Sequence, residues 1–452
     1  MSFASVVAVA PEPPSRWSDV YLAAVARGVS VCGDFLAATA LVLTLQGSGA
    51  GGYAVAALLL AKTVPMAALA PIAGRIADRV DSRTVLVIAG LGQAVTCAAL
   101  AFVSHPVAVI ALVTLLSVGL AVTQPTLAAL VPAMVRKEDV ARASATNQTA
   151  ATVGMMAGPA LAGVLVGQFG ATIPLLIDAV SYLALVAAGL LLRTRRGGAA
   201  AATTGTGDGG RPAATWSLWR DPLLRAMVVA IAAVVGAVGA INVAHVFLVR
   251  ETLGASETVF GIIEAVEMAG MLVGAWLFAR LARRTADDRI LVWGVLVQLG
   301  VMCLLTPVAA VVATALWLIP IWIVTGLLSG GMNVFSGVAM ANRVPAESRG
   351  RAFATFGGTI QAAGMFGFFA GGVLVEQMPI RPLFAAAGLA GVTVVLALVP
   401  STVRATRAAR FGTAPTDDRA VVGDGDRAAP SATTVPVDRP VATTAGYGGN
   451  HE

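Results

Sequence analysis

Residues 71–87 read PIAGRIADRVDSRTVLV and place a short run of charges between two long apolar stretches. Asp78, Arg79 and Arg83 would each be costly in the hydrocarbon of a bilayer. We therefore expect this stretch to lie at a membrane surface, with a membrane-spanning helix on each side of it.

The composition of the chain favours a bilayer as its solvent. Hydrophobic residues make up 57% and charged residues 12% of the 452 residues, whereas about 25% of the residues in soluble domains are charged. A spanning helix needs about 20 apolar residues, and twelve such runs are predicted, which makes the chain an all-α membrane protein. The predicted helices are 18–45, 53–76, 83–103, 106–131, 142–167, 171–192, 223–249, 257–281, 289–310, 313–340, 351–376 and 380–400.

Positive charge in the predicted loops indicates the orientation. The loops predicted at one face of the membrane hold most of the Arg and Lys residues, whereas the loops at the other face hold only Arg250 and Arg381. Because positively charged loops stay in the cytoplasm, we expect both termini there, in a multi-pass protein of the cell (inner) membrane. The first 15 residues hold no Lys or Arg ahead of their apolar patch, so a cleaved signal peptide is not expected. The loops assigned to the cytoplasm hold Arg75, Arg79, Arg83, Arg136, Lys137, Arg142, Arg193, Arg195, Arg196, Arg280, Arg283, Arg284, Arg343 and Arg349.

An internal repeat divides the helices into two halves. The segment RASAT at 142–146 aligns with RAFAT at 351–355, and without a gap Gly158 then meets Gly367. Both copies begin at the same face of the membrane, as in a parallel repeat with a substrate site between the halves near mid-membrane. Chance similarity between two helices rich in Gly and Ala is the alternative.

The predicted organisation has five segments. A cytoplasmic N-terminal tail (1–16) precedes the first six-helix bundle (17–192), and a flexible cytoplasmic linker rich in Gly, Ala and Thr (193–222) leads to the second six-helix bundle (223–400). The composition changes again after Pro400, so a disordered cytoplasmic tail is predicted at 401–452.

The charged loop resembles the loop signature of the major facilitator superfamily of transporters. Gly74, Asp78, Arg79 and Arg83 match that signature, and Asp81-Ser82 stand where it usually has Gly-Arg. The resemblance implies the major facilitator fold, two pseudo-symmetric six-helix bundles, and a cytoplasmic latch that stabilises one of two access states. A plain positively charged loop is the alternative.

Residues 154–163, GMMAGPALAG, resemble the helix-five signature of drug/proton antiporters. Gly154, Gly158, Pro159 and Gly163 match, with Ala162 at one of the usual glycines. The stretch 27–34, RGVSVCGD, also resembles the start of the first helix in the macrolide-efflux and enterobactin-exporter-like branch. These resemblances imply export. A close-packed bundle helix without bearing on direction is the alternative.

Ionisable residues also fall inside predicted helices, where they are rare and mark functional sites. Asp34 and Lys62 both lie about 15 Å below the predicted outer surface, so they could pair. A substrate role and a neutralised packing pair both stay open. The six residues assigned to the proton-coupling or substrate cavity are Asp34, Lys62, Asp178, His245, Glu264 and Glu267.

Glu264 and Glu267 are three residues apart and share one face of their helix. Two carboxylates this close in a low dielectric cannot both ionise cheaply, so one of them is expected to exchange a proton. His245 could reach the upper glutamate, and cargo bound by these acids should be cationic. Water-exposed acids near the outer mouth are the alternative.

The sequence therefore predicts a secondary active transporter that exports lipophilic, cationic small molecules by proton antiport with alternating access. An uptake permease or a lipid flippase of the same fold is the alternative. No protease, hydrolase or ATP-binding motif is found, so neither an enzyme nor a cofactor is expected, and the proton gradient is the energy source.

Cys32, Cys97 and Cys303 lack metal-site spacing. The expected partners are the substrate, protons and the lipid bilayer, not nucleic acid, and the functional unit is a monomer.

Overall fold

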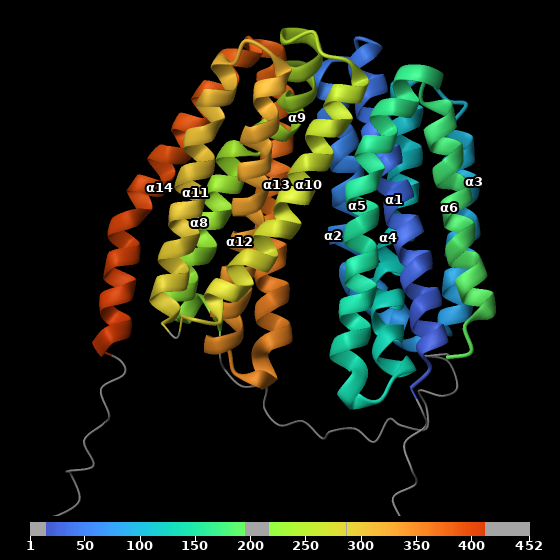
Figure 1. The fold of residues 1–452 in the computed structure, drawn as a ribbon, viewed down its shortest axis with the longest axis horizontal. Helices are drawn as coiled ribbons and strands as arrows, with labels where there is room; N and C mark the ends of the chain where they lie inside the picture. Colours follow the sequence, from blue (N-terminus) through green and yellow to red (C-terminus); the bar gives the residue numbers. More distant parts are fainter. Residues whose placement is uncertain (1–14, 195–216, 286, 412–452) are drawn as a thin grey trace, which may run out of the picture. The chain divides into compact units, whose positions relative to one another are not determined.

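The computed structural model describes residues 15–194, 217–285 and 287–411. Within that part of the chain, twelve helical segments are long and apolar enough to cross a membrane (Figure 1). The first half consists of α1 (Trp17–Gly47), α2 (Gly51–Arg79), α3 (Ser82–Leu100), α4 (Pro106–Leu130), α5 (Val140–Phe169) and α6 (Thr172–Leu191). The second half consists of α8 (Pro222–Val238), α9 (Ala240–Phe247), α10 (Glu257–Ala282), α11 (Asp288–Val311), α12 (Leu318–Arg343), α13 (Arg349–Gln377) and α14 (Ile380–Phe411). The predicted all-α architecture with twelve spanning helices is confirmed.

Acidic residues in the short loops start several of these helices. Oδ1 of Asp221 accepts hydrogen bonds from the N–H groups of Leu223 (2.9 Å) and Leu224 (3.1 Å) at the start of α8. Asp81 and Asp287 cap α3 and α11 in the same way. A side-chain acceptor at this position satisfies N–H groups that have no partner inside the helix. Asp81 in the charged loop therefore begins a helix.

The seventh spanning segment differs from its prediction as one helix over 223–249. It is interrupted at Gly239 between α8 and α9, and it ends in a turn of π-helix over Leu248–Thr252. A Cβ atom at Gly239 would lie 2.8 Å from Cα of Gly367 in α13. The close approach of α13 requires glycine here, and glycine is a poor helix former. The break therefore follows from packing between helices.

The last helix extends beyond its predicted end, and the prediction of a disordered tail from residue 401 is wrong for residues 401–411. α14 continues through Pro400 to Phe411. Ser401 and Thr402 donate their hydroxyls to the carbonyl of Leu398, at 2.7 and 3.0 Å. Thr402 and Ala405 are buried, so packing holds the extension in place. The predicted tails at 1–14 and 412–452, and residues 195–216 of the predicted linker, lie outside the described residues.

The two copies of the repeat adopt the same local structure. The hydroxyl of Thr146 donates to the carbonyl of Arg142 at 3.0 Å, and the hydroxyl of Thr355 donates to the carbonyl of Arg351 at 2.9 Å. Both bonds lie in the first turns of α5 and α13. Many other threonines of the spanning helices make the same bond, for example Thr44 and Thr114, so the common origin of the two copies stays a prediction.

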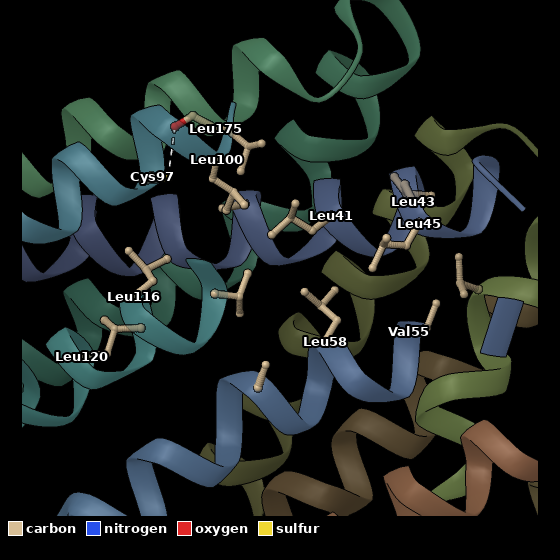
Figure 2. Close-up of a cluster of buried hydrophobic side chains, with 14 of the residues drawn as sticks. Leu41, Leu43, Leu45, Val55, Leu58, Cys97, Leu100, Leu116, Leu120 and Leu175 are labelled. Carbon is tan, nitrogen blue, oxygen red and sulfur yellow. Dashed lines mark hydrogen bonds between the residues drawn. The ribbon is translucent and has the colours of Figure 1, made fainter. Parts of the chain in front are cut away.

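A buried apolar cluster holds the first half together and continues into one end of the second. Figure 2 shows leucines of several helices gathered in this cluster, among them Leu41 of α1, Leu58 of α2 and Leu116 of α4. Cys97 of α3 donates its thiol to the carbonyl of Leu175 in α6, at 3.3 Å. The same cluster includes Phe247 of α9, whereas a separate cluster fills the remainder of the second half.

The halves are joined at the end opposite the start of α1, which we call the closed end. Three hydrogen bonds cross between the halves there: Gln46 to Glu251 at 3.0 Å, the N–H of Gly52 to Glu376 at 2.6 Å, and Thr258 to the carbonyl of Gly163 at 3.3 Å. In Figure 1 α5 and α10 approach each other at this end and diverge toward the end where α1 starts and α14 finishes.

Candidate functional site

A cavity of about 490 Å³ lies between the halves. Its walls come from α1 and α2 of the first half and from α8–α14 of the second. Four of the ionisable residues predicted from the sequence line it, namely Lys62, His245, Glu264 and Glu267. The structure thus places together residues that are up to 205 positions apart in the chain (62 to 267).

His245 and Glu264 form one polar contact in the cavity wall. Nδ1 of His245 in α9 lies 2.9 Å from Oε1 of Glu264 in α10, so the predicted reach between these helices is confirmed. The imidazole stacks on Trp322, with ring centroids 4.5 Å apart and planes 18° apart, and it also contacts Phe260. Its other nitrogen, Nε2, is buried with no hydrogen-bond partner among the described residues.

Glu267 lies one turn further along α10 on the same face as Glu264, and its half-buried side chain lines the cavity. Unlike Glu264, it has neither a hydrogen-bond nor an ion-pair partner in the part of the chain that is described. Two neighbouring carboxylates repel when both are ionised, so a proton or a cationic ligand relieves them. Their place between the halves argues against acids that are simply exposed at the surface.

Asp34 and Lys62 lie near each other but do not form an ion pair. Both line a second, smaller cavity of about 40 Å³. Among the described residues, no N···O contact of 4.0 Å or less joins them. The hydroxyl of Tyr182 instead donates to Asp34, and Nζ of Lys62 lies 5.0 Å from the ring centroid of Phe35. Lys62 therefore borders both cavities.

Asp178 does not line either of these cavities, which corrects its assignment to the substrate cavity. Its side chain is fully buried between α3 and α6 and accepts hydrogen bonds from Cys97 (3.2 Å) and Ser181 (2.9 Å). These partners allow a polar group in the core of the first half. The sequence prediction missed Tyr182, although Asp178, Ser181 and Tyr182 follow helical spacing on one face of an apolar helix.

The charged loop lies at the end of the molecule opposite the closed end. α2 continues through it to Arg79, which is exposed, and Arg83 is half-buried in the first turn of α3. A Cβ atom at Gly74 would meet nothing within 4 Å. The backbone of Asp78 belongs to α2, and its side chain lies outside the described part of the structure. The latch stays a prediction.

The glycines of α5 bring this helix close to two others. A Cβ atom at Gly154 would lie 2.9 Å from the backbone nitrogen of Cys32 in α1, and one at Gly158 would lie 2.7 Å from the carbonyl oxygen of the same residue. At Gly163 a Cβ atom would lie 2.6 Å from the carbonyl oxygen of Glu257 in α10. The motif therefore packs α5 within its own half and against the other half, and the predicted close approach is confirmed. Pro159 is buried in the same stretch.

Comparison with known proteins agrees with this architecture. The family described as Major Facilitator Superfamily matches residues 23–248 and again residues 227–442. A search of curated proteins finds no match.

Solved structures of transporters resemble the chain in fold at low sequence identity. The nucleoside transporter NupG is 14% identical, with a TM-score of 0.69 over 85% of this chain and 98% of that one. A peptide transporter POT in complex with sulfate is 14% identical, with a TM-score of 0.68 over 86% and 95% of the two chains. A bacterial homologue of the iron transporter ferroportin, in an inward-facing state, is 16% identical, with a TM-score of 0.64 over 86% and 99%.

Proposed function

The chain belongs to the major facilitator superfamily, and we propose that it is a secondary active transporter that exports lipophilic, cationic small molecules in exchange for protons. The direction follows from the resemblance of α5 and of the start of α1 to exporters. The proposal places the protein in the cell membrane as a functional monomer with both termini in the cytoplasm. The proton gradient drives it, without a cofactor.

The observation that supports this proposal best is the pair of carboxyl groups in the cavity between the halves. The cavity of about 490 Å³ falls within the roughly 300–1,000 Å³ of small-molecule sites. Glu264 and Glu267 face it together with Phe260, Trp322 and other apolar residues. A carboxylate can hold a proton or attract a cation but does not do both at once, so binding of one releases the other.

The contacts between the halves support alternating access. The hydrogen bonds that cross between them lie at the closed end, while the helices diverge toward the termini. With both termini in the cytoplasm, this arrangement corresponds to a conformation that faces the cytoplasm. Rocking of the halves would then open the cavity to the other side. The transported molecules named for the similar structures differ among themselves, so none of them is carried over to this chain.

The first prediction tests Glu267. We expect Glu267→Gln to abolish the response of export to a pH gradient, because an amide cannot exchange a proton. Export of tetraphenylphosphonium from proteoliposomes is measured with and without an imposed gradient that is acidic on the receiving side. The wild type should respond, and the gradient-driven rate of the variant should fall about tenfold or more, the equivalent of ~1.4 kcal/mol.

The matched control is Glu347→Gln, which removes an exposed carboxylate far from the cavity and should behave as the wild type. An unchanged gradient response in Glu267→Gln would refute its role as the proton carrier. Accumulation of the probe in place of its extrusion would refute export and favour the uptake permease.

A further inference from the structure

From the distribution of charge around the cavity, we infer that this transporter prefers molecules that bear an acidic group as well as a basic one over simple cations, and that Lys62 binds the acidic group. The inference rests on the proposed transport function and adds to it a preference, among molecules with a basic group, for those that also carry an acidic group.

Charges of opposite sign line the cavity from different halves. Lys62 comes from α2 of the first half, whereas Glu264 and Glu267 come from α10 of the second half. No ion pair of 4.0 Å or less joins Lys62 to either glutamate in the described part of the chain. The two signs are therefore held apart, and a ligand between them experiences both.

Among the described residues, Lys62 has no hydrogen-bond or ion-pair contact, although the charges of Asp34 and Asp178 act on it from a greater distance. Its ammonium faces the ring of Phe35 at 5.0 Å from the centroid, which is a cation–π contact. A lysine in the middle of a spanning helix normally pairs with an acid or reaches water. An acidic group of a ligand in the cavity would supply a partner in direct contact.

Asp34 is a counter-charge for Lys62, but the two side chains do not touch. It borders the smaller cavity together with Lys62, but its carboxylate accepts the hydroxyl of Tyr182 and lies beyond ion-pair distance from the ammonium. Asp178, a further buried acid of the first half, is bonded to Cys97 and Ser181 and lines neither cavity.

The remainder of the wall suits an apolar body between two charged ends. The rings of Phe35, Phe260 and Trp322 border the same cavity. A simple cation would be attracted by the glutamates and repelled by Lys62, and a simple anion would meet the reverse. An aromatic molecule with a carboxylate at one end and an amine at the other can place its carboxylate near Lys62 and its amine near the two glutamates.

Matched forms of one fluorescent compound test the inference. Norfloxacin carries a carboxylate and an amine, its ethyl ester carries only the amine, and its N-acetyl derivative carries only the carboxylate. Binding of each to the purified full-length protein in lipid nanodiscs is followed by fluorescence. We expect norfloxacin to bind about tenfold or more tightly than either single-charge derivative, because each derivative leaves one charged wall without a partner.

Three variants assign the preference to Lys62. Lys62→Met should reduce the ratio of the norfloxacin and ester affinities about tenfold, and Lys62→Arg should retain the ratio. The chain's other lysine, Lys137, lies in an exposed loop, so Lys137→Met is the matched control and should retain it too. The ratio is measured within one preparation, so it does not depend on the fraction of each variant that folds.

A second measurement uses the small number of lysines. Norfloxacin should protect Lys62 from reductive methylation, read by mass spectrometry, while Lys137 remains reactive and the ester protects neither.

Equal binding of norfloxacin and its ester to the wild type, no binding of any of the three forms, or an unchanged ratio in Lys62→Met would overturn the inference. Export of tetraphenylphosphonium driven by a pH gradient would in each of these cases leave the proposed function standing. Loss of that export as well would show that the proposed function itself has failed.

Discussion

His245 combines an apolar and a polar contact in a single buried side chain. Its ring stacks on Trp322, and one nitrogen lies 2.9 Å from the carboxylate of Glu264. The other nitrogen has no partner among the described residues, which costs about 1–3 kcal/mol when the atom is buried. The contact with Glu264 therefore makes His245 a candidate for a role in transport beyond packing.

At this scale we predict that His245→Phe separates stability from transport. Phenylalanine preserves the ring stack and removes the unpartnered nitrogen, so the midpoint of thermal unfolding should stay the same or rise. Transport driven by the pH gradient should fall about tenfold, the equivalent of ~1.4 kcal/mol, because Glu264 loses its hydrogen-bond partner. His105→Phe, at an exposed loop residue, should leave transport unchanged. Full transport in His245→Phe would show that the contact is only structural.

Single side chains also show where the sequence is informative and where it is not. Hydropathy and spacing alone identify Glu264 and Glu267 as a pair on one face, because helical geometry fixes that relation. The neighbour of Asp34 could not be predicted in the same way. Lys62 and Tyr182 lie at about the same depth in the membrane as Asp34, so depth cannot choose between them. Only packing between helices places the tyrosine hydroxyl on the carboxylate of Asp34.

Among the helices, α5 has glycines that pack against different neighbours at different points along its length. Gly154 and Gly158 lie against α1, whereas Gly163 lies against α10 at the closed end. Gly167, one turn further, is exposed, and a Cβ atom there would approach nothing closer than 3.7 Å. Two glycines of the same helix therefore differ only in what lies opposite them.

This pair predicts opposite effects of the same substitution. Gly167→Ala should raise the free energy of unfolding by roughly 0.5–1 kcal/mol, because alanine is the better helix former. Gly163→Ala should lower it by about 1–3 kcal/mol through overpacking against α10. Thermal unfolding of the purified variants measures both. A stabilising Gly163→Ala would contradict the close approach of α5 and α10.

For the whole molecule, the closed end is the region where hydrogen bonds cross between the halves among the described residues. Glu376 of α13 accepts the N–H of Gly52 at 2.6 Å, so the second half caps the first turn of α2. N–H groups at a helix start have no partner inside the helix. Opening this end must break the bond, and the cap stabilises the conformation in which the two halves meet here.

We therefore expect Glu376→Leu to favour opening at the closed end. Glu376 is exposed, so water screens this hydrogen bond and it contributes about 1 kcal/mol; amide hydrogen exchange at the start of α2 should therefore accelerate by about fivefold. Mass spectrometry of peptides that cover residues 51–54 measures the exchange. Glu347→Gln, at an exposed residue near the opposite end, is the control. Unchanged exchange in Glu376→Leu would show that the cap does not hold the halves together.

The sequence by itself was enough to predict that the chain lies in a bilayer, how many helices span it and that the helices form two halves. These properties depend on local hydropathy, on charge at helix ends and on repeats, and each of these can be recognised in the order of the residues alone. It also identified the residues whose burial in a membrane demands an explanation.

Only the tertiary structure decided which of those residues share a cavity. It separated Asp178 from the site, left Lys62 without an ion pair among the described residues and closed the halves at one end. It also decided the break at Gly239 and the extension of α14, because each depends on close packing against another helix. Contacts between residues distant in the chain follow from the complementary shapes of packed helices, and these shapes exist only once the chain has folded.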